Sequence, residues 1–210
     1  MTGLPNLLTL SRILVIPLIV GFIWYGEDTY RWIAFGLYAF AGITDYLDGY
    51  LARSLNQHSD FGRLLDPIAD KLLVGAVLLI LCSLDHISGY SLLPALIILL
   101  REILVSGLRE FLAEIQVRMP VSRLAKWKTT FQIGSLGFLI VGSAGPDWLP
   151  TVLIGEGLLW AAAILTLITG YDYLRSGLTH VSPEAEAERA RRKASTAAKS
   201  TTGKSAPADA

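Results

Sequence analysis

The sequence contains the stretch Asp45-Tyr-Leu-Asp48-Gly49-Tyr-Leu-Ala52-Arg53, followed by eight residues and then by Gly62-Arg-Leu-Leu-Asp66-Pro-Ile-Ala-Asp70. It sets four aspartates within two segments that are expected to lie in a membrane. A carboxylate in a membrane helix is costly, and four close together repel one another strongly. A divalent cation relieves both effects, and oxygen ligands at this density suit Mg²⁺, Mn²⁺ or Ca²⁺. The stretch therefore predicts a hard-metal site within a helical membrane protein.

The spacing of these residues predicts two helix faces that meet. On one helix, a single face carries Asp45, Asp48, Gly49 and Ala52, with Arg53 at its margin. On the next, Gly62, Asp66 and Asp70 form a stripe at i, i+4 spacing. A tight turn over residues 54–61 would set the helices antiparallel, so that the four carboxylates can bind one or two Mg²⁺ ions.

The other residues of the stretch allow more than one role. The planar fork of Arg53 suits a phosphate group. The small residues Gly49, Ala52 and Gly62 lie on the same faces as the acids. They either let the helices pack closely or let a flat ligand group lie against the backbone.

The composition places this acidic stretch in a membrane protein. Of the 210 residues, 52% are hydrophobic and only 17% are charged, which lies on the membrane side of ordinary globular composition. Apolar segments long enough to cross a bilayer of about 30 Å recur along the chain. The expected fold is all-α, with six transmembrane helices at roughly 8–26, 31–53, 62–84, 91–115, 127–145 and 149–175.

Lysine and arginine predict the orientation of the spans. Among lysines and arginines, only Arg31 falls in the links expected between spans 1 and 2, 3 and 4, and 5 and 6. The opposite side collects Arg12, Arg53, Arg63, Arg118, Arg123, Lys126, Lys128 and Arg175. Both termini and the acidic stretch are therefore expected on the cytoplasmic side. Because the basic residues follow this topology and form no soluble patch, no nucleic-acid partner is expected.

The chain changes character near its end. Residues 182–210 are mainly Ala, Ser, Thr, Lys and Glu and lack large apolar residues, so they cannot bury a core. We expect a membrane domain over residues 1–181 and a disordered, polar and basic cytoplasmic tail over 182–210. The tail either rests on anionic lipid head groups or is simply solvated.

The acidic stretch resembles the signature of the CDP-alcohol phosphotransferase family, Asp-x-x-Asp-Gly-x-x-Ala-Arg-x8-Gly-x-x-x-Asp-x-x-x-Asp, without departure at any fixed position. The surrounding sequence resembles bacterial members that make phosphatidylglycerophosphate. That likeness is carried by Asn6-Leu-Leu-Thr9-Leu-Ser-Arg12 with Pro17, by Phe61 to Lys71, by Arg101 to Glu110, and by Lys126 to Thr130. It covers roughly residues 4–175 and does not reach the tail.

The resemblance implies a six-helix membrane enzyme, a homodimer in the bacterial inner membrane with its active site facing the cytoplasm. Its substrates would be CDP-diacylglycerol and sn-glycerol 3-phosphate, and its products phosphatidylglycerophosphate and CMP. Two Mg²⁺ or Mn²⁺ ions would bind Asp45, Asp48, Asp66 and Asp70, and Asp70 would also be the general base. The CDP part would contact Asn6, Thr9, Gly49, Ala52, Arg53 and Gly62.

An acceptor that is itself a phosphate dianion needs a second, basic site. The candidates are Arg101 and Arg109 in the fourth span, with Lys126 and Lys128 at the start of the fifth. Arginines inside an apolar helix are functional by default. They can alternatively pair with Glu102 or Glu110, and the lysines can alternatively anchor the helix at the membrane interface.

Two other functions compete with this one. A sister enzyme of the same family would use inositol phosphate, serine or phosphatidylglycerol as the acceptor. A divalent-cation transporter would also place acids in a membrane, but it needs polar residues through to the far side. Segments 33–42 and 72–81 are nearly free of them.

Overall fold

The computed structural model describes residues 4–55, 60–115, 117 and 123–181, and within these the side chains of 9–45, 65–115, 117, 124–175, 177 and 178. The described residues form six α-helices and two short 3₁₀ helices. In chain order these are α1 (Leu4–Tyr25), α2 (Asp28–Leu55), α3 (Asp60–Ser83), η1 (Gly89–Ser91), α4 (Leu92–Glu114), α5 (Arg123–Val141), η2 (Gly142–Ala144) and α6 (Thr151–Val181).

The all-α prediction is confirmed, and each expected segment corresponds to one helix. The boundaries differ where polar residues continue a helix beyond its apolar part. Helix α1 begins at Leu4, and α6 continues to Val181. Helices α2 and α3 also extend into the turn that was expected over residues 54–61. Helix α2 ends at Leu55, and α3 begins at Asp60. The predicted tail, 182–210, lies outside the described residues.

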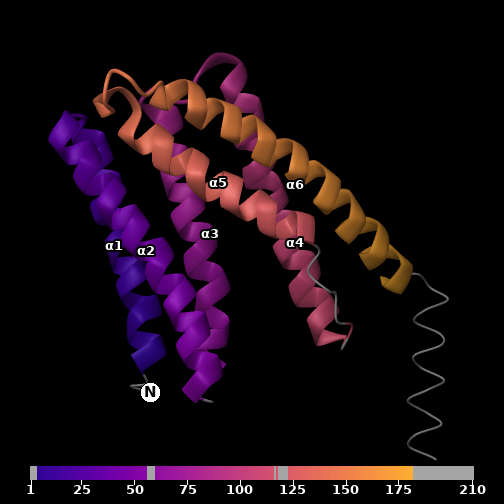
Figure 1. Cartoon of the computed structure of the whole chain (residues 1–210). Helices are drawn as coiled ribbons and strands as arrows, with labels where there is room; N and C mark the ends of the chain where they lie inside the picture. Colours follow the sequence, from indigo (N-terminus) through magenta and orange to yellow (C-terminus); the bar gives the residue numbers. More distant parts are fainter. Residues whose placement is uncertain (1–3, 56–59, 116, 118–122, 182–210) are drawn as a thin grey trace, which may run out of the picture.

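Two groups of helices make up the structure (Figure 1). Helix α1 packs against α2 and α3, while α6 packs against α4 and α5. Contact between α2 and α5 joins the groups. A single apolar core runs through all six helices, from Ile19 in α1 to Leu159 in α6. Small residues allow the closest approach, since a Cβ added at Gly155 of α6 would lie 2.8 Å from Leu139 Cγ of α5.

The exposed and buried side chains are distributed as expected for a protein in lipid. Leu14, Leu79 and Leu153 are 64%, 71% and 69% exposed, whereas Arg12 and Lys128 are 2% and 5% exposed. By length and composition, Gly89–Glu114 and Thr151–Arg175 can cross a membrane, and Thr9–Tyr25 is apolar but shorter. Helices α2, α3 and α5 carry charged residues, which lower their hydropathy.

The link regions at one end of the helices meet at the buried Arg31 of α2. Its guanidinium donates to the carbonyl oxygens of Gly26 (3.3 Å) and Val141 (3.5 Å) and contacts Nε2 of His86. Because an arginine only donates, Nε2 accepts and the imidazole is neutral. Burial and the Arg31 charge lower the pKa of His86, against a smaller opposing effect of Asp85. Arg31 thus connects the α1–α2, α3–α4 and α5–α6 links.

We predict that Gly142→Ala lowers the free energy of unfolding by about 1–2 kcal/mol, because an alanine there would adopt a left-handed conformation. Gly142 has a φ of +53°, and an added Cβ would overlap the Arg31 guanidinium. The matched control is Gly36→Ala in α2, where no heavy atom lies within 4 Å of the added Cβ. Thermal or denaturant unfolding in detergent measures both, and equal stability of the two variants would contradict the analysis.

Candidate active site

Asp45 of α2 and Asp70 of α3 both contact the buried Arg12 of α1. Arg12 Nη1 lies 2.7 Å from Asp45 Oδ1 and 3.0 Å from Asp70 Oδ1. One turn earlier on the same helix, Thr9 Oγ1 donates to Asp66 Oδ1 at 2.6 Å. Residues 9 and 12 lie three apart and so share one helix face. Helix α1 therefore provides a donor to each of these three aspartates and connects α2 to α3.

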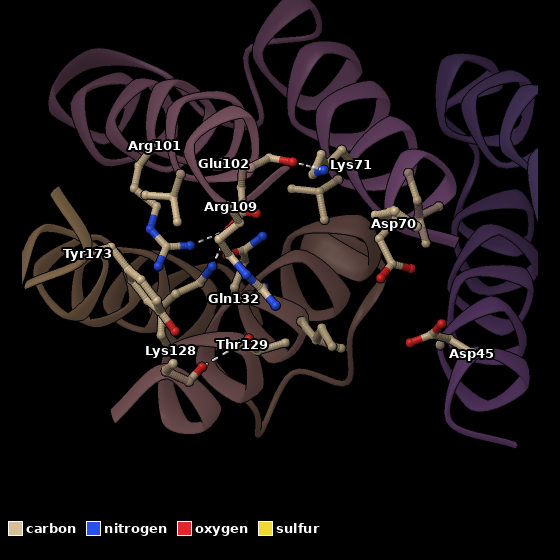
Figure 2. A pocket seen from close by; sticks show the side chains of 18 of the residues that line it. Asp45, Asp70, Lys71, Arg101, Glu102, Arg109, Lys128, Thr129, Gln132 and Tyr173 are labelled. Carbon is tan, nitrogen blue, oxygen red and sulfur yellow. Dashed lines mark hydrogen bonds and ion pairs between the residues drawn. The ribbon is translucent and has the colours of Figure 1, made fainter. Parts of the chain in front are cut away.

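The arrangement suits hard cations. Asp45 and Asp70 reach the same nitrogen atom, so their carboxylates lie close together, and Figure 2 shows both at one end of a cavity. Asp45, Asp66 and Asp70 use only Oδ1 in their contacts within the described chain, which leaves each Oδ2 as a free, hard oxygen donor. Such oxygens fit Mg²⁺ or Mn²⁺.

The complete four-carboxylate site stays a prediction. Among the described residues, no group of three or more acidic, histidine or cysteine side chains lies close enough to hold an ion. Asp48 belongs to α2, but its side chain is outside the described set. The same holds for the other predicted nucleotide contacts apart from Thr9, namely Asn6, Gly49, Ala52, Arg53 and Gly62.

A cavity of about 520 Å³ extends from Asp45 and Asp70 between helices α2 to α6. Its opposite end is lined by basic residues of α4 and α5 (Figure 2). Three of the four residues predicted to bind the acceptor phosphate line this end: Arg101, Arg109 and Lys128. The fourth, Lys126, is exposed and does not line the cavity. Helix packing thus joins the predicted acidic and basic sites in one space.

At the basic end, Glu102 pairs with two basic side chains. Lys128 Nζ donates to Glu102 Oε1, and Arg101 Nη1 lies 3.3 Å from the same oxygen. Arg101 also donates to Thr169 Oγ1 at 3.3 Å and lies over the ring of Tyr173, 5.8 Å from its centroid. The pairing of Arg101 with Glu102 that the sequence left open is therefore present, and it orients the arginine within the cavity wall.

Arg109 differs from its neighbours. Within the described chain it makes no hydrogen bond or ion pair, and Figure 2 shows its side chain extending into the middle of the cavity. Its possible partner Glu110 instead accepts from Ser106 at 3.3 Å and lies 3.7 Å from Lys71 Nζ. An uncommitted guanidinium in a cavity is well suited to a bidentate contact with a phosphate.

Sequence reasoning gave no site role to several residues that the structure brings to the site. Arg12 had been counted toward the orientation and the family likeness but given no site role, although a charge in an apolar helix was a usable signal. Lys71 directly follows Asp70 and donates to Ser106 Oγ, so it joins α3 to α4. Gln132 and Tyr173 also line the cavity. Nothing in their local sequence distinguished these two from ordinary core residues.

Comparison with known proteins identifies the family. A family model described as CDP-alcohol phosphatidyltransferase matches residues 2–168. Curated relatives named CDP-diacylglycerol–glycerol-3-phosphate 3-phosphatidyltransferase include one from Rickettsia typhi, 48% identical over 86% of this chain and 99% of the relative. A relative from Pseudomonas fluorescens is 39% identical over 89% of this chain and 95% of the relative. One from Cereibacter sphaeroides is 36% identical over 87% of this chain and 98% of the relative. The chain belongs to the CDP-alcohol phosphatidyltransferase family and is a transferase.

We predict that Arg12→Gln lowers the free energy of unfolding by about 1.5–3 kcal/mol, the usual contribution of hydrogen bonds to charged groups, because the half-exposed Asp45 and Asp70 are partly screened by solvent. The loss arises because Asp45 and Asp70 would then repel each other without a shared cation. The control is Thr44→Val, since Thr44 is also buried but donates only to carbonyls of its own helix, those of Phe40 and Ala41. Unfolding in detergent is the measurement, and similar losses in both variants would refute the bridging role.

Proposed function

We propose that the chain transfers the phosphatidyl group of CDP-diacylglycerol to sn-glycerol 3-phosphate, releasing phosphatidylglycerophosphate and CMP. The observation that carries the proposal is the cavity with carboxylates at one end and cations at the other. A donor neutralised by metal ions suits the first end, and a phosphate-bearing acceptor suits the second. The names of the relatives specify the same two substrates.

The protein would act in the bacterial inner membrane, with all six helices spanning it and both termini in the cytoplasm. The outward-facing leucines and buried charges support this placement. Figure 1 shows the α1–α2, α3–α4 and α5–α6 links at one end, and the start of α1, the end of α2 and the start of α3 at the other. A cavity near the cytoplasmic edge would give the acyl chains access to lipid and the nucleotide access to water. A homodimer is part of the proposal.

The donor would bind at the acidic end. Asp45, Asp48, Asp66 and Asp70 would hold two Mg²⁺ or Mn²⁺ ions, which neutralise the diphosphate and the charge that develops on the leaving CMP. Thr9 already orients Asp66, and Arg12 already orients Asp45 and Asp70. Family likeness adds Asn6, Gly49, Ala52, Arg53 and Gly62 as contacts of the CDP part.

The acceptor would place its phosphate at the basic end and its primary hydroxyl toward Asp70. The hydroxyl oxygen forms a bond to the phosphorus that carries diacylglycerol, while the bond from that phosphorus to the CMP oxygen breaks with its electron pair. Asp70, whose Oδ2 has no partner in the described chain, takes the hydroxyl proton. Positioning and charge neutralisation would supply most of the rate, as in other phosphoryl transfers.

The test is CMP release from CDP-diacylglycerol with four acceptors offered in turn: sn-glycerol 3-phosphate, inositol phosphate, serine and phosphatidylglycerol. We expect release with the first alone, its loss on chelation of divalent metal, and its return with Mg²⁺. Release with a different acceptor would select a sister activity, and release with none would refute the function. Metal uptake into vesicles without CMP release would support a transporter.

Asp66→Asn and Asp70→Asn should each abolish CMP release at Mg²⁺ concentrations that saturate the unaltered protein. The amide removes one negative charge and a metal ligand while it keeps the side-chain shape. Both variants should remain folded, as judged by unfolding in detergent, so that the loss is chemical. Turnover at the original rate in either variant would refute the metal-site assignment.

Arg109→Ala should raise the KM for the acceptor by about tenfold or more while leaving the donor KM nearly unchanged, because a hydrogen bond to a charged group contributes about 1.5–3 kcal/mol. The control is Arg175→Ala, which removes the same charge from an exposed position outside the cavity. It should leave both constants unchanged. Equal shifts of the two constants in Arg109→Ala would return that arginine to a structural role.

A further inference from the structure

One polar side chain in the cavity wall has none of its hydrogen-bonding capacity used. Gln132 of α5 is 4% exposed, its Oε1 is fully buried, and its carboxamide makes no hydrogen bond within the described chain. Leaving a buried polar group without a partner costs about 1–3 kcal/mol. A group kept at that cost in a cavity wall points to a ligand that satisfies it.

The position of Gln132 connects it to the basic end. It lies four residues after Lys128, so both side chains project from the same face of α5 into the cavity. Lys128 is committed to Glu102, and so is Arg101 through its Nη1. Figure 2 shows Gln132 near Arg109, Lys128 and Thr129, with Asp45 and Asp70 farther away across the cavity. A ligand held by these cations would pass the carboxamide.

Three groups in this wall define the ligand. Arg101 Nε is buried and without a partner in the described chain, and Arg109 is uncommitted; both only donate, so they suit phosphate oxygens. The carboxamide of Gln132 offers both an acceptor and donors. A phosphate oxygen only accepts and would leave Oε1 unsatisfied, whereas a hydroxyl can donate to Oε1 or accept from Nε2. The complementary ligand therefore carries a phosphate and a hydroxyl close to it.

We propose that Gln132 is a specificity-determining residue whose carboxamide binds the secondary hydroxyl of the acceptor. This inference rests on the proposed function. In sn-glycerol 3-phosphate the secondary hydroxyl lies between the phosphate and the attacking primary hydroxyl, and Gln132 lines the same cavity as the basic residues and Asp70. Gln132 thus selects acceptor alcohols that carry a hydroxyl on the carbon adjacent to the one that bears the phosphate.

The test compares two acceptors that differ only in that hydroxyl: sn-glycerol 3-phosphate and 3-hydroxypropyl phosphate. Both carry the phosphate and the reacting primary hydroxyl. The unaltered protein should prefer the first in kcat/KM by about tenfold or more, because the second leaves the buried carboxamide unpaired. In Gln132→Met, which removes the polar atoms at similar volume, kcat/KM for the first acceptor should fall until the two are used almost equally.

The matched control is Ser135→Ala, on the same helix. Ser135 is equally buried but donates to the carbonyl of Gly155 at 2.8 Å, outside the cavity. Its loss should lower stability and leave the preference between acceptors unchanged. The donor KM should be unaffected in both variants. Comparing the acceptors in the unaltered protein tests the idea even if Gln132→Met fails to fold.

The outcomes separate this inference from the function beneath it. If the unaltered protein uses both acceptors equally, or if a folded Gln132→Met keeps the full preference, then the role of Gln132 is refuted and the transfer reaction stands. If a water molecule and not the acceptor makes the hydrogen bonds of Gln132, then Gln132→Met would keep the full preference. If the unaltered protein releases CMP with neither acceptor, the proposed function itself is refuted and the role of Gln132 with it.

Discussion

The structure depends on one buried guanidinium that pairs with two half-exposed carboxylates. Asp45 and Asp70 come from different helices and would repel each other at their interface. Arg12 Nη1 lies within 3.0 Å of one oxygen of each, and the residue is almost fully buried. Because one guanidinium pairs with a carboxylate from each of two other helices, this contact fixes α1, α2 and α3 relative to one another. The acidic end of the cavity exists only because these three helices meet there.

The basic end follows the opposite design. There the excess charge is positive, and Glu102 neutralises part of it by holding Arg101 and Lys128. Arg109 and Gln132 remain uncommitted within the described chain. A cavity with carboxylates at one end and uncommitted donors at the other would be preorganised for two charged substrates. Preorganised dipoles and charges lower the reorganisation that accompanies the reaction itself.

The surroundings of the cavity make these charges tolerable. Leucines such as Leu14 and Leu153 face outward, and the polar groups gather between helices. Close packing through glycine, as between Gly155 and Leu139, substitutes for the hydrophobic effect, which cannot drive helices together in lipid. On the far side, the neutral His86 and the buried Arg31 hold the three links together. The same helix packing therefore places apolar side chains on the outside and the polar groups of the site between the helices.

The sequence by itself determined the helices and the character of each end of the site. Apolar length predicted six helices, and i, i+4 spacing predicted that Asp66 and Asp70 share a face, since both depend only on the geometry of one helix. The family likeness added the reaction. Only the tertiary structure decided that α1 supplies Arg12 and that Gln132 shares a cavity with Asp70. These residues come from helices that are distant in the sequence. Which helix faces meet depends on how the side chains of all six helices pack together, and no local sequence pattern encodes that packing.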